Sequence, residues 1–188
     1  MAQPTFWHPP DQDWAERDLE SLPTDGHRYE IVKGALVVTP PADDNHHELA
    51  DELRAELRAD LPAGWRVIRE IGIRLVESNA IPDVTVLRPG APRGVKWHEA
   101  KSVALVVEVE SRSSRGTGRF AKPGLYAEAG IESYWRIERT DDGPVAHVYQ
   151  LADAGHYELF ASVGPADSVR VERPFPVDVI PAAWMPRG

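Results

Sequence analysis

The amino-acid sequence predicts an α/β protein whose 188 residues form a single domain, with one sheet of mixed strand direction and helices packed on it. Two patterns support this fold class. Leucines recur every fourth residue within 43–61, which is typical of the buried face of a helix. The segment 103–109 (VALVVEV) is apolar on both faces, which is typical of a central strand covered on each side.

The first third of the chain is expected to hold two helices and a hairpin. Residues 1–25 are predicted to be a helical appendage, because the segment DQDWAERDLESL places Trp and Leu on one side of a short helix. The segment YEIVKGALVVTPP has two strand-like runs around Lys-Gly, which indicates a β-hairpin. The leucine pattern predicts the next helix, over 43–61, with Asp44 or Asn45 as its N-cap.

Strand patterns dominate the rest of the chain. The segments WRVIREIGIRLV, PDVTVL and VALVVEV are expected to be strands. A loop rich in Gly and Arg follows, and then a helix from about Pro123 to Ala129 that ends at Gly130. Because SYWRIE, VAHVYQL, HYELFAS and SVRVE are separated by turn residues, extra strands are expected at the C-terminal end.

Composition excludes several classes of function. The sequence contains no cysteine, which excludes disulfides, a zinc-thiolate site and a cysteine nucleophile. The N-terminus lacks the pattern of a signal peptide, and no apolar run approaches the ~18 residues of a membrane helix. We therefore expect a cytoplasmic protein without a membrane partner. The net charge of -9 argues against a protein that coats nucleic acid non-specifically.

A local basic strip departs from this acidic average. Between positions 111 and 122 the chain carries Arg112, Arg115, Arg119 and Lys122 and no acidic residue. The three arginines are candidates for binding the phosphates of a nucleic acid, since such contacts need concentrated positive charge. Solvated surface is the alternative for all three.

Acidic residues gather in two strand segments. Asp83 opens one strand after a proline, and Glu108 and Glu110 lie two apart on another, so both glutamates point to the same face. If the two strands are neighbours, three carboxylates lie in one patch and can recruit a cation. Oxygen ligands without His or Cys suit Mg²⁺ or Mn²⁺. The alternative is that Asp83 caps a strand end and the glutamates lie on a solvated edge.

Several short motifs follow one another in a specific order. They are PD at 82–83, EVxS at 108–111, a lysine at 122 and YxxxGxxxYW at 126–135. The segment RYEIVKGALVVTPP, the helix with His46, whose role stays unassigned, and the closing PFPVDV extend the match over most of the chain. In this order and spacing the sequence resembles the Uma2 family of restriction-endonuclease-like proteins, a branch of the PD-(D/E)xK nuclease superfamily.

The resemblance implies a restriction-endonuclease-like fold and a metal-dependent DNA endonuclease. Asp83 and Glu108 would be the metal-binding carboxylates, with the Val109 carbonyl as a third ligand and Mg²⁺ or Mn²⁺ as the ion. Lys122 and Glu30 would complete the catalytic set. DNA is the expected substrate, and a homodimer is expected by analogy with nucleases that cut both strands.

Three positions depart from the family pattern. Arg112 stands where the family usually has proline, and Gly118 removes an aspartate that usually stands four residues before the lysine. Pro123 follows Lys122 directly and disfavours helical dihedrals there, which places Lys122 at the edge of its helix. These departures favour the alternative of a nuclease fold that binds nucleic acid or a protein without cutting. A third alternative is a metal-dependent hydrolase of another phosphate ester.

Overall fold

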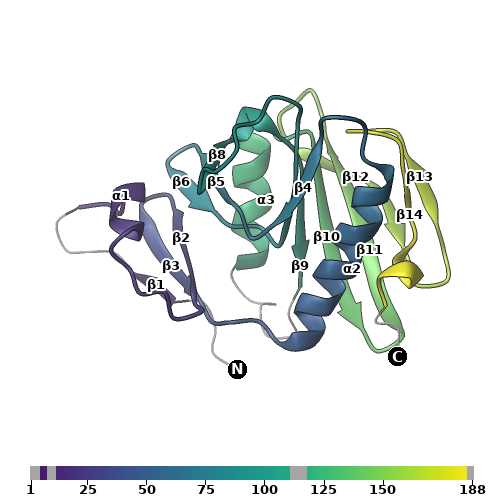
Figure 1. Ribbon diagram of the computed structural model, residues 1–188, viewed down its shortest axis with the longest axis horizontal. Coiled ribbons are helices and arrows are strands. Elements are labelled where there is room, and N and C mark those ends of the chain that lie inside the picture. Colours follow the sequence, from purple (N-terminus) through teal and green to yellow (C-terminus); the bar gives the residue numbers. More distant parts are fainter. Residues whose placement is uncertain (1–4, 8–11, 111–117, 186–188) are drawn as a thin grey trace.

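Strands form three sheets within the residues that the computed structural model describes, which are 5–7, 12–110 and 118–185 (Figure 1). The first sheet has the spatial order β1 (Thr5–Trp7), β3 (Ala35–Thr39), β2 (Arg28–Val32), β6 (Ser78–Ala80), β5 (Gly72–Leu75), β8 (Trp97–Glu99). The second has the order β12 (Tyr157–Val163), β11 (Gly143–Leu151), β10 (Ser133–Thr140), β9 (Val103–Val109), β7 (Val84–Leu87), β4 (Arg66–Arg69). The third consists of β13 (Val169–Val171) and β14 (Val177–Val179).

Both larger sheets are mixed, which confirms the predicted fold class. Strands β5 and β8 are parallel in the first sheet, and β9 and β10 are parallel in the second. The prediction of one sheet was wrong, because the segment WRVIREIGIRLV divides between the two sheets as β4 and β5. Between these strands Glu70 has a φ of 50°, and this left-handed backbone redirects the chain from the second sheet to the first.

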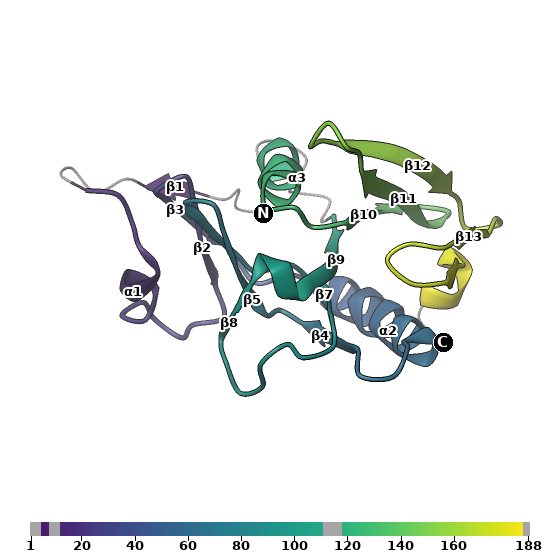
Figure 2. The same ribbon diagram turned by 90° about the horizontal axis from the view of Figure 1, so that it is seen from above.

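The centre of the second sheet is buried on both faces, as the apolar run at 103–109 predicts. Helix α2 (Asp44–Asp60) covers one face and helix α3 (Gly118–Glu128) covers the other (Figure 2). Leu105 and Val107 of β9 pack in one core cluster with Leu53 of α2. Val106 packs in a second cluster with Tyr126 of α3. Strand β9 therefore carries its acidic end into the interior between two layers.

The start of α3 differs from the prediction. The helix begins at Gly118 rather than near Pro123, so Lys122 and Pro123 lie inside it and not at its edge. A proline here costs one backbone hydrogen bond, but burial of Leu125, Tyr126 and the following alanine anchors the helix in the core. The predicted end is confirmed, because Gly130 has a φ of 74° and donates its amide to the Ala127 carbonyl.

The start of α2 also differs, by one residue. Its N-cap is Asp43 rather than Asp44 or Asn45, because the Asp43 side chain accepts a hydrogen bond from the His46 amide at 2.8 Å. This cap places His46 on the first turn with its side chain buried. The predicted hairpin is confirmed as β2 and β3, with Lys33 and Gly34 both at positive φ in the turn.

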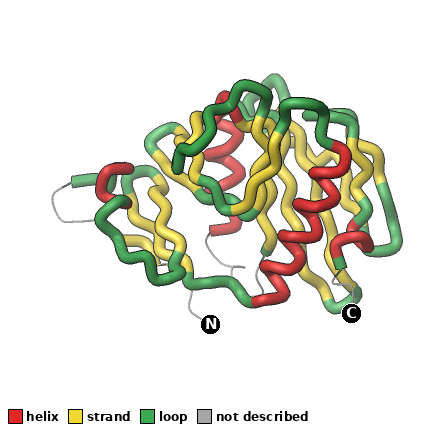
Figure 3. The backbone as a smooth tube through the Cα atoms, in the orientation of Figure 1, coloured by secondary structure: helices red, strands yellow, loops and turns green. Residues whose placement is uncertain are grey.

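The N-terminal part is less helical than predicted. The expected helix over the segment DQDWAERDLESL is reduced to α1 (Glu16–Leu19), and the strand β1, which the sequence pattern does not indicate, pairs with β3. Directly before α1, Ala15 has an extended backbone, and the Trp14 amide donates to the Gly34 carbonyl of the hairpin turn at 2.9 Å. The tube view shows how little of the molecule is helical (Figure 3).

The C-terminal segment follows the predicted strand pattern. Strands β10 to β12 form an antiparallel meander, and β13 and β14 form a separate hairpin-like pair. Two short 3₁₀ helices, Ala100–Ser102 and Pro181–Trp184, complete the described secondary structure. No helix in the described part of the chain is long and apolar enough to cross a membrane.

Candidate active site

The candidate site lies where the first sheet, the second sheet and both long helices meet. Strands β7 and β9 are antiparallel neighbours with Val84 opposite Val107, so Asp83 lies beside the end of β9 that carries Glu108. Strand β2 contributes Arg28 and Glu30, which are two positions apart and therefore lie on the same face of the strand. Helix α3 contributes Lys122 and Tyr126, and helix α2 contributes His46.

Asp83 is almost fully buried and is bonded through both oxygens. Its Oδ1 accepts from Arg28 Nη2 at 2.9 Å and lies 3.1 Å from His46 Nε2. Its Oδ2 accepts from the Val109 amide at 2.7 Å. Burial opposes ionisation, but the Arg28 charge and these contacts hold the pKa of Asp83 well below its ordinary value. Asp83 is therefore a carboxylate at neutral pH.

Glu108 is bonded to helix α3. Its Oε1 accepts from the Tyr126 hydroxyl at 2.6 Å and from Lys122 Nζ at 3.2 Å. Burial raises the pKa of Glu108; Lys122 lowers it, but the negative charges of Asp83 and Glu30 raise it again, and the pKa lies above its ordinary value. Two neighbouring carboxyls, Asp83 and Glu108, thus have pKa values that shift in opposite directions.

Lys122 joins Glu108 to Glu30. Its Nζ donates to Glu30 Oε1 at 2.8 Å, and the same oxygen accepts from the Ile81 amide at 2.6 Å. Burial opposes the charge on Lys122, but Glu108 and Glu30 outweigh it and raise the pKa of the ammonium above its ordinary value. Lys122 is therefore a fixed cation between two carboxylates.

Glu110 has a different ionic partner from Glu108. It accepts from Arg136 Nη1 at 2.7 Å, and Arg136 lies directly opposite Glu108 on the neighbouring strand β10. Glu110 as a metal ligand stays a prediction. The Val109 carbonyl as a metal ligand also stays a prediction, because it is the Val109 amide, not its carbonyl, that contacts Asp83.

The alternative of a solvated strand edge was wrong. Strand β9 has β7 on one side and β10 on the other, so it is not an edge. Asp83 and Glu30 are 2% and 1% exposed, and the Glu108 side chain is 16% exposed. Buried carboxylates are costly unless they are paired, and each of these three has a cationic partner.

The donor set fits a hard divalent cation in charge and chemistry. Asp83, Glu108 and Glu30 bring three negative charges against the two positive charges of Arg28 and Lys122, and their candidate ligand atoms are oxygens. Burial, and after it the negative charges of Asp83 and Glu30, raise the pKa of Glu108, and a bound cation would oppose both effects. Within the described residues, no three His, Asp or Glu side chains are arranged as a group that could hold a metal ion.

Sequence reasoning missed the residues that connect the carboxylates. Arg28, which bonds Asp83, begins the strand segment RYEIV. Its position two residues before Glu30, on the same face of the strand, was the available signal that both belong to one site. Tyr126 lies in the core, and its hydroxyl also bonds Glu108. Of the predicted phosphate-binding residues, Arg112 and Arg115 lie outside the described residues, and for Arg119 the structure describes only the backbone, in α3.

Comparison with known proteins places the chain in a class of restriction-endonuclease-like proteins. The chain belongs to the Uma2 family, described as "Putative restriction endonuclease", whose family model matches residues 16–183. A crystal structure of "a putative nuclease belonging to DUF820" from Anabaena variabilis has a similar fold, with a TM-score of 0.66 and 16% sequence identity over 82% of this chain and 87% of that chain. No curated protein sequence matches.

Proposed function

We propose that the protein is a metal-dependent endonuclease that hydrolyses phosphodiester bonds of DNA with a metal-activated water. The observation that carries this proposal is that Lys122 bonds both Glu30 and Glu108, while Asp83 lies beside Glu108 on the neighbouring strand. Phosphodiester hydrolysis needs an activated water and compensation for charge on the phosphoryl oxygens. A site with clustered carboxylates and a fixed cation supplies both requirements.

Each residue of the site has a separate role in this proposal. Asp83 and Glu108, with the Val109 carbonyl, would hold Mg²⁺ or Mn²⁺, which when bound lowers the pKa of water and offsets phosphate charge. Lys122 compensates charge on the phosphoryl oxygens, and Glu30 orients Lys122 through the 2.8 Å contact. Arg28 and Tyr126 act as positioning residues for the two metal-binding carboxylates.

The second candidate function is a nuclease fold that binds nucleic acid or protein without cutting. One observation favours it: Arg28 and Lys122 already bond oxygens of the carboxylates that the endonuclease would use for metal. In this candidate the ion pairs are structural, and a metal adds nothing to stability. The two candidates therefore differ in metal binding as well as in activity.

The first experiment measures nicking of supercoiled plasmid in Mg²⁺ or Mn²⁺. Asp83→Ala, Glu108→Ala and Lys122→Ala should each reduce nicking to background, and double variants should lose no more than single ones, because the residues act as one unit. Glu56→Ala and Lys101→Ala, at exposed positions, are the matched controls and should cut at the wild-type rate. Cutting that survives in Asp83→Ala would point to a contaminating nuclease.

Thermal unfolding separates the two candidates without a substrate. A metal ion that binds only the folded chain stabilises that chain by about 2.7 kcal/mol when its concentration is about a hundred times its Kd. For a chain of this size the melting temperature should rise by roughly 5 to 10 °C in Mn²⁺, and Asp83→Ala should abolish the rise. A wild-type melting temperature unchanged by millimolar Mn²⁺ supports the non-cutting candidate.

Arg112, Arg115 and Arg119 remain our proposed phosphate contacts. Replacing Arg115 and Arg119 together by alanine should reduce the slope of log affinity against log salt by about two, because each phosphate contact releases about one counterion. The measurement is DNA binding over a series of salt concentrations. An equal pair of substitutions on α2, Arg54→Ala with Arg58→Ala, is the control and should leave the slope unchanged. A slope that the first pair does not change either assigns those arginines to solvated surface.

A further inference from the structure

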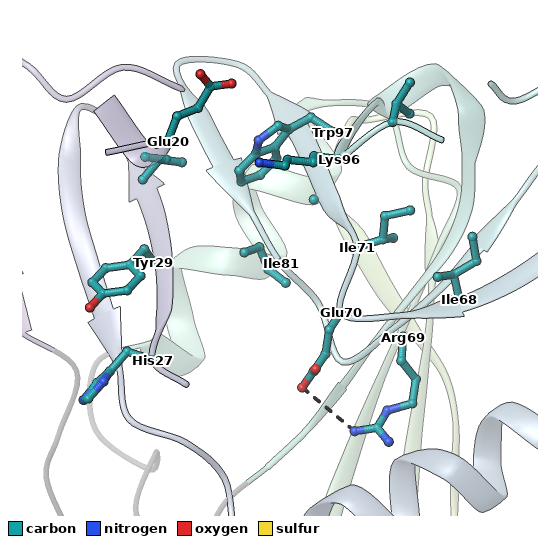
Figure 4. A pocket seen from close by; sticks show the side chains of 13 residues that line it. Glu20, His27, Tyr29, Ile68, Arg69, Glu70, Ile71, Ile81, Lys96 and Trp97 are labelled. Atoms are coloured by element: carbon teal, nitrogen blue, oxygen red, sulfur yellow. Dashed lines mark ion pairs between the residues drawn. The ribbon is translucent and has the colours of Figure 1, made fainter. Parts of the chain in front are cut away.

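A pocket of about 500 Å³ lies beside the candidate active site (Figure 4). It is lined by the end of α1, by β2, by the connection from β4 to β5 and by the start of β8. Ile71 and Ile81 give it an apolar wall, and Tyr29 and Trp97 lie on two different sides of it (Figure 4). Its size is that of pockets that hold small organic ligands or single nucleotides.

Trp97 is fixed in place by a glycine. Gly72 lies opposite Trp97 in the parallel pair of β5 and β8, and a Cβ at Gly72 would come within 2.2 Å of the indole ring. The ring therefore packs directly against the backbone, and only glycine permits this approach. An aromatic ring held in this way loses little further conformational freedom when a flat ligand stacks on it.

The pocket is connected to the candidate active site through Glu70. Glu70 lines the pocket, and its Oε1 accepts from Arg28 Nη2 at 3.1 Å. The same nitrogen donates to Asp83 at 2.9 Å, and the Glu70 amide donates to the Asp83 carbonyl. One guanidinium thus bonds the wall of the pocket and a proposed metal-binding carboxylate at the same time.

We propose that this pocket binds one unpaired nucleobase of the strand whose phosphodiester lies at Asp83 and Glu108. This inference rests on the proposed function. The aromatic and isoleucine side chains suit the two faces of a base, and Glu20, His27 and Lys96 offer hydrogen-bond acceptors and donors for its edge. A base paired inside a duplex cannot enter, so the preferred substrate is single-stranded or locally unpaired nucleic acid.

Binding of a fluorescently labelled oligonucleotide to the full chain tests the proposal. Anisotropy is measured in Ca²⁺, which binds carboxylate oxygens and is used to limit cutting, with one single strand and its duplex. The wild type should bind the single strand more tightly than the duplex. Trp97→Ala should weaken single-strand binding about tenfold, because stacking of one base contributes an effect of this order, whereas Trp97→Phe should stay within about threefold of wild type.

A second readout detects stacking itself. A 2-aminopurine in the strand should lose fluorescence on binding to the wild type and to Trp97→Phe, but not to Trp97→Ala. Phe160→Ala, which removes an aromatic ring that is 49% exposed on β12, is the matched control and should behave as wild type. If circular dichroism shows that Trp97→Ala does not fold, Tyr29→Leu takes its place with the same expectation.

The outcomes separate this inference from the function on which it rests. The base pocket is overturned if both Trp97→Ala and Tyr29→Leu bind and quench as the wild type does, or if the wild type binds the duplex more tightly than the single strand. If the wild type still nicks plasmid in that case, the proposed endonuclease function stands. A wild type that neither nicks plasmid nor binds either oligonucleotide overturns the proposed function, and the base pocket with it.

Discussion

The two central carboxyls show how position alone separates chemically similar residues. Asp83 meets a guanidinium, an imidazole and a backbone amide, so its ionised form is stabilised despite burial. Glu108 meets one ammonium and one hydroxyl but faces two other carboxylates. Neighbouring groups whose pKa values are driven apart are typical of sites that divide binding and proton-transfer roles.

The opposite pKa shifts predict opposite effects on stability in metal-free buffer. The pKa of Asp83 is lower in the folded chain than in the unfolded chain, so its ionised form stabilises the fold above the unfolded-state pKa, and this stability is lost as the pH falls through the folded-state pKa. Asp83→Asn should therefore lower the free energy of unfolding at pH 7 by about 3–5 kcal/mol. A raised carboxyl pKa means that the fold binds a proton more tightly than the unfolded chain, so ionised Glu108 costs stability at pH 7.

Glu108→Gln should therefore raise the melting temperature at pH 7, and its advantage over wild type should shrink as pH falls through the raised pKa of Glu108. Thermal unfolding in EDTA between pH 4 and pH 8 measures both variants. Glu56→Gln, on the exposed face of α2, is the control and should match wild type throughout. A destabilised Glu108→Gln would mean that the bonds to Tyr126 and Lys122 outweigh the cost of burying the Glu108 charge beside two other carboxylates.

At the scale of elements, α3 delivers the cation of the site in spite of an unfavourable sequence. Pro123 lies inside the helix, where it removes a backbone hydrogen bond, and it is followed by glycine. The helix nevertheless continues, because Tyr126 and its neighbours are buried against the second sheet. Tertiary packing, rather than helix propensity, thus places Lys122 between Glu30 and Glu108.

Pro123→Ala tests this account of α3. It should raise stability, by up to about 3 kcal/mol, because alanine restores the amide donor and favours the helix. Nicking should stay within about threefold of wild type, since the contacts of Lys122 do not involve residue 123. Pro181→Ala is the contrasting variant: this proline lies at the start of a 3₁₀ helix, where proline is favoured, so its loss should not stabilise. A tenfold loss of nicking in Pro123→Ala would assign the proline a role in positioning Lys122.

At the scale of the whole molecule, the candidate site connects the two larger sheets. Arg28 of β2, in the first sheet, bonds Asp83 beside β7 of the second, and Glu30 of β2 bonds Lys122 of α3. These ion pairs are buried, so removing one partner leaves an uncompensated charge. We propose on this basis that residues 1–188 unfold as one domain.

Two probes of unfolding test the single-domain proposal. Tryptophan fluorescence and far-ultraviolet circular dichroism should give coincident denaturant transitions for the wild type. Arg28→Leu should move both transitions together to lower denaturant concentration, because it should lower the free energy of unfolding by about 3–5 kcal/mol. Arg170→Leu, which breaks an exposed pair with Asp178, is the control and should shift them by less than about 1 kcal/mol. Separate transitions for the two probes in the wild type would show that the sheets unfold independently.

The sequence by itself determined the features that depend on local pattern. The leucine repeat predicted α2, the apolar run predicted β9 with its limits, and the Lys33-Gly34 pair predicted the hairpin turn. These succeeded because periodicity and turn chemistry act between residues that are close in the chain. The order of the short motifs also identified the family.

Only the tertiary structure decided which side chains meet. Arg28 and Asp83 are 55 positions apart, and Glu30 and Lys122 are 92 apart. Their contacts depend on strand order and on the division of the chain between two sheets at Glu70, which no local pattern encodes. The start of α3 is decided in the same way, because burial of its far end outweighs the proline that local propensity treats as a boundary.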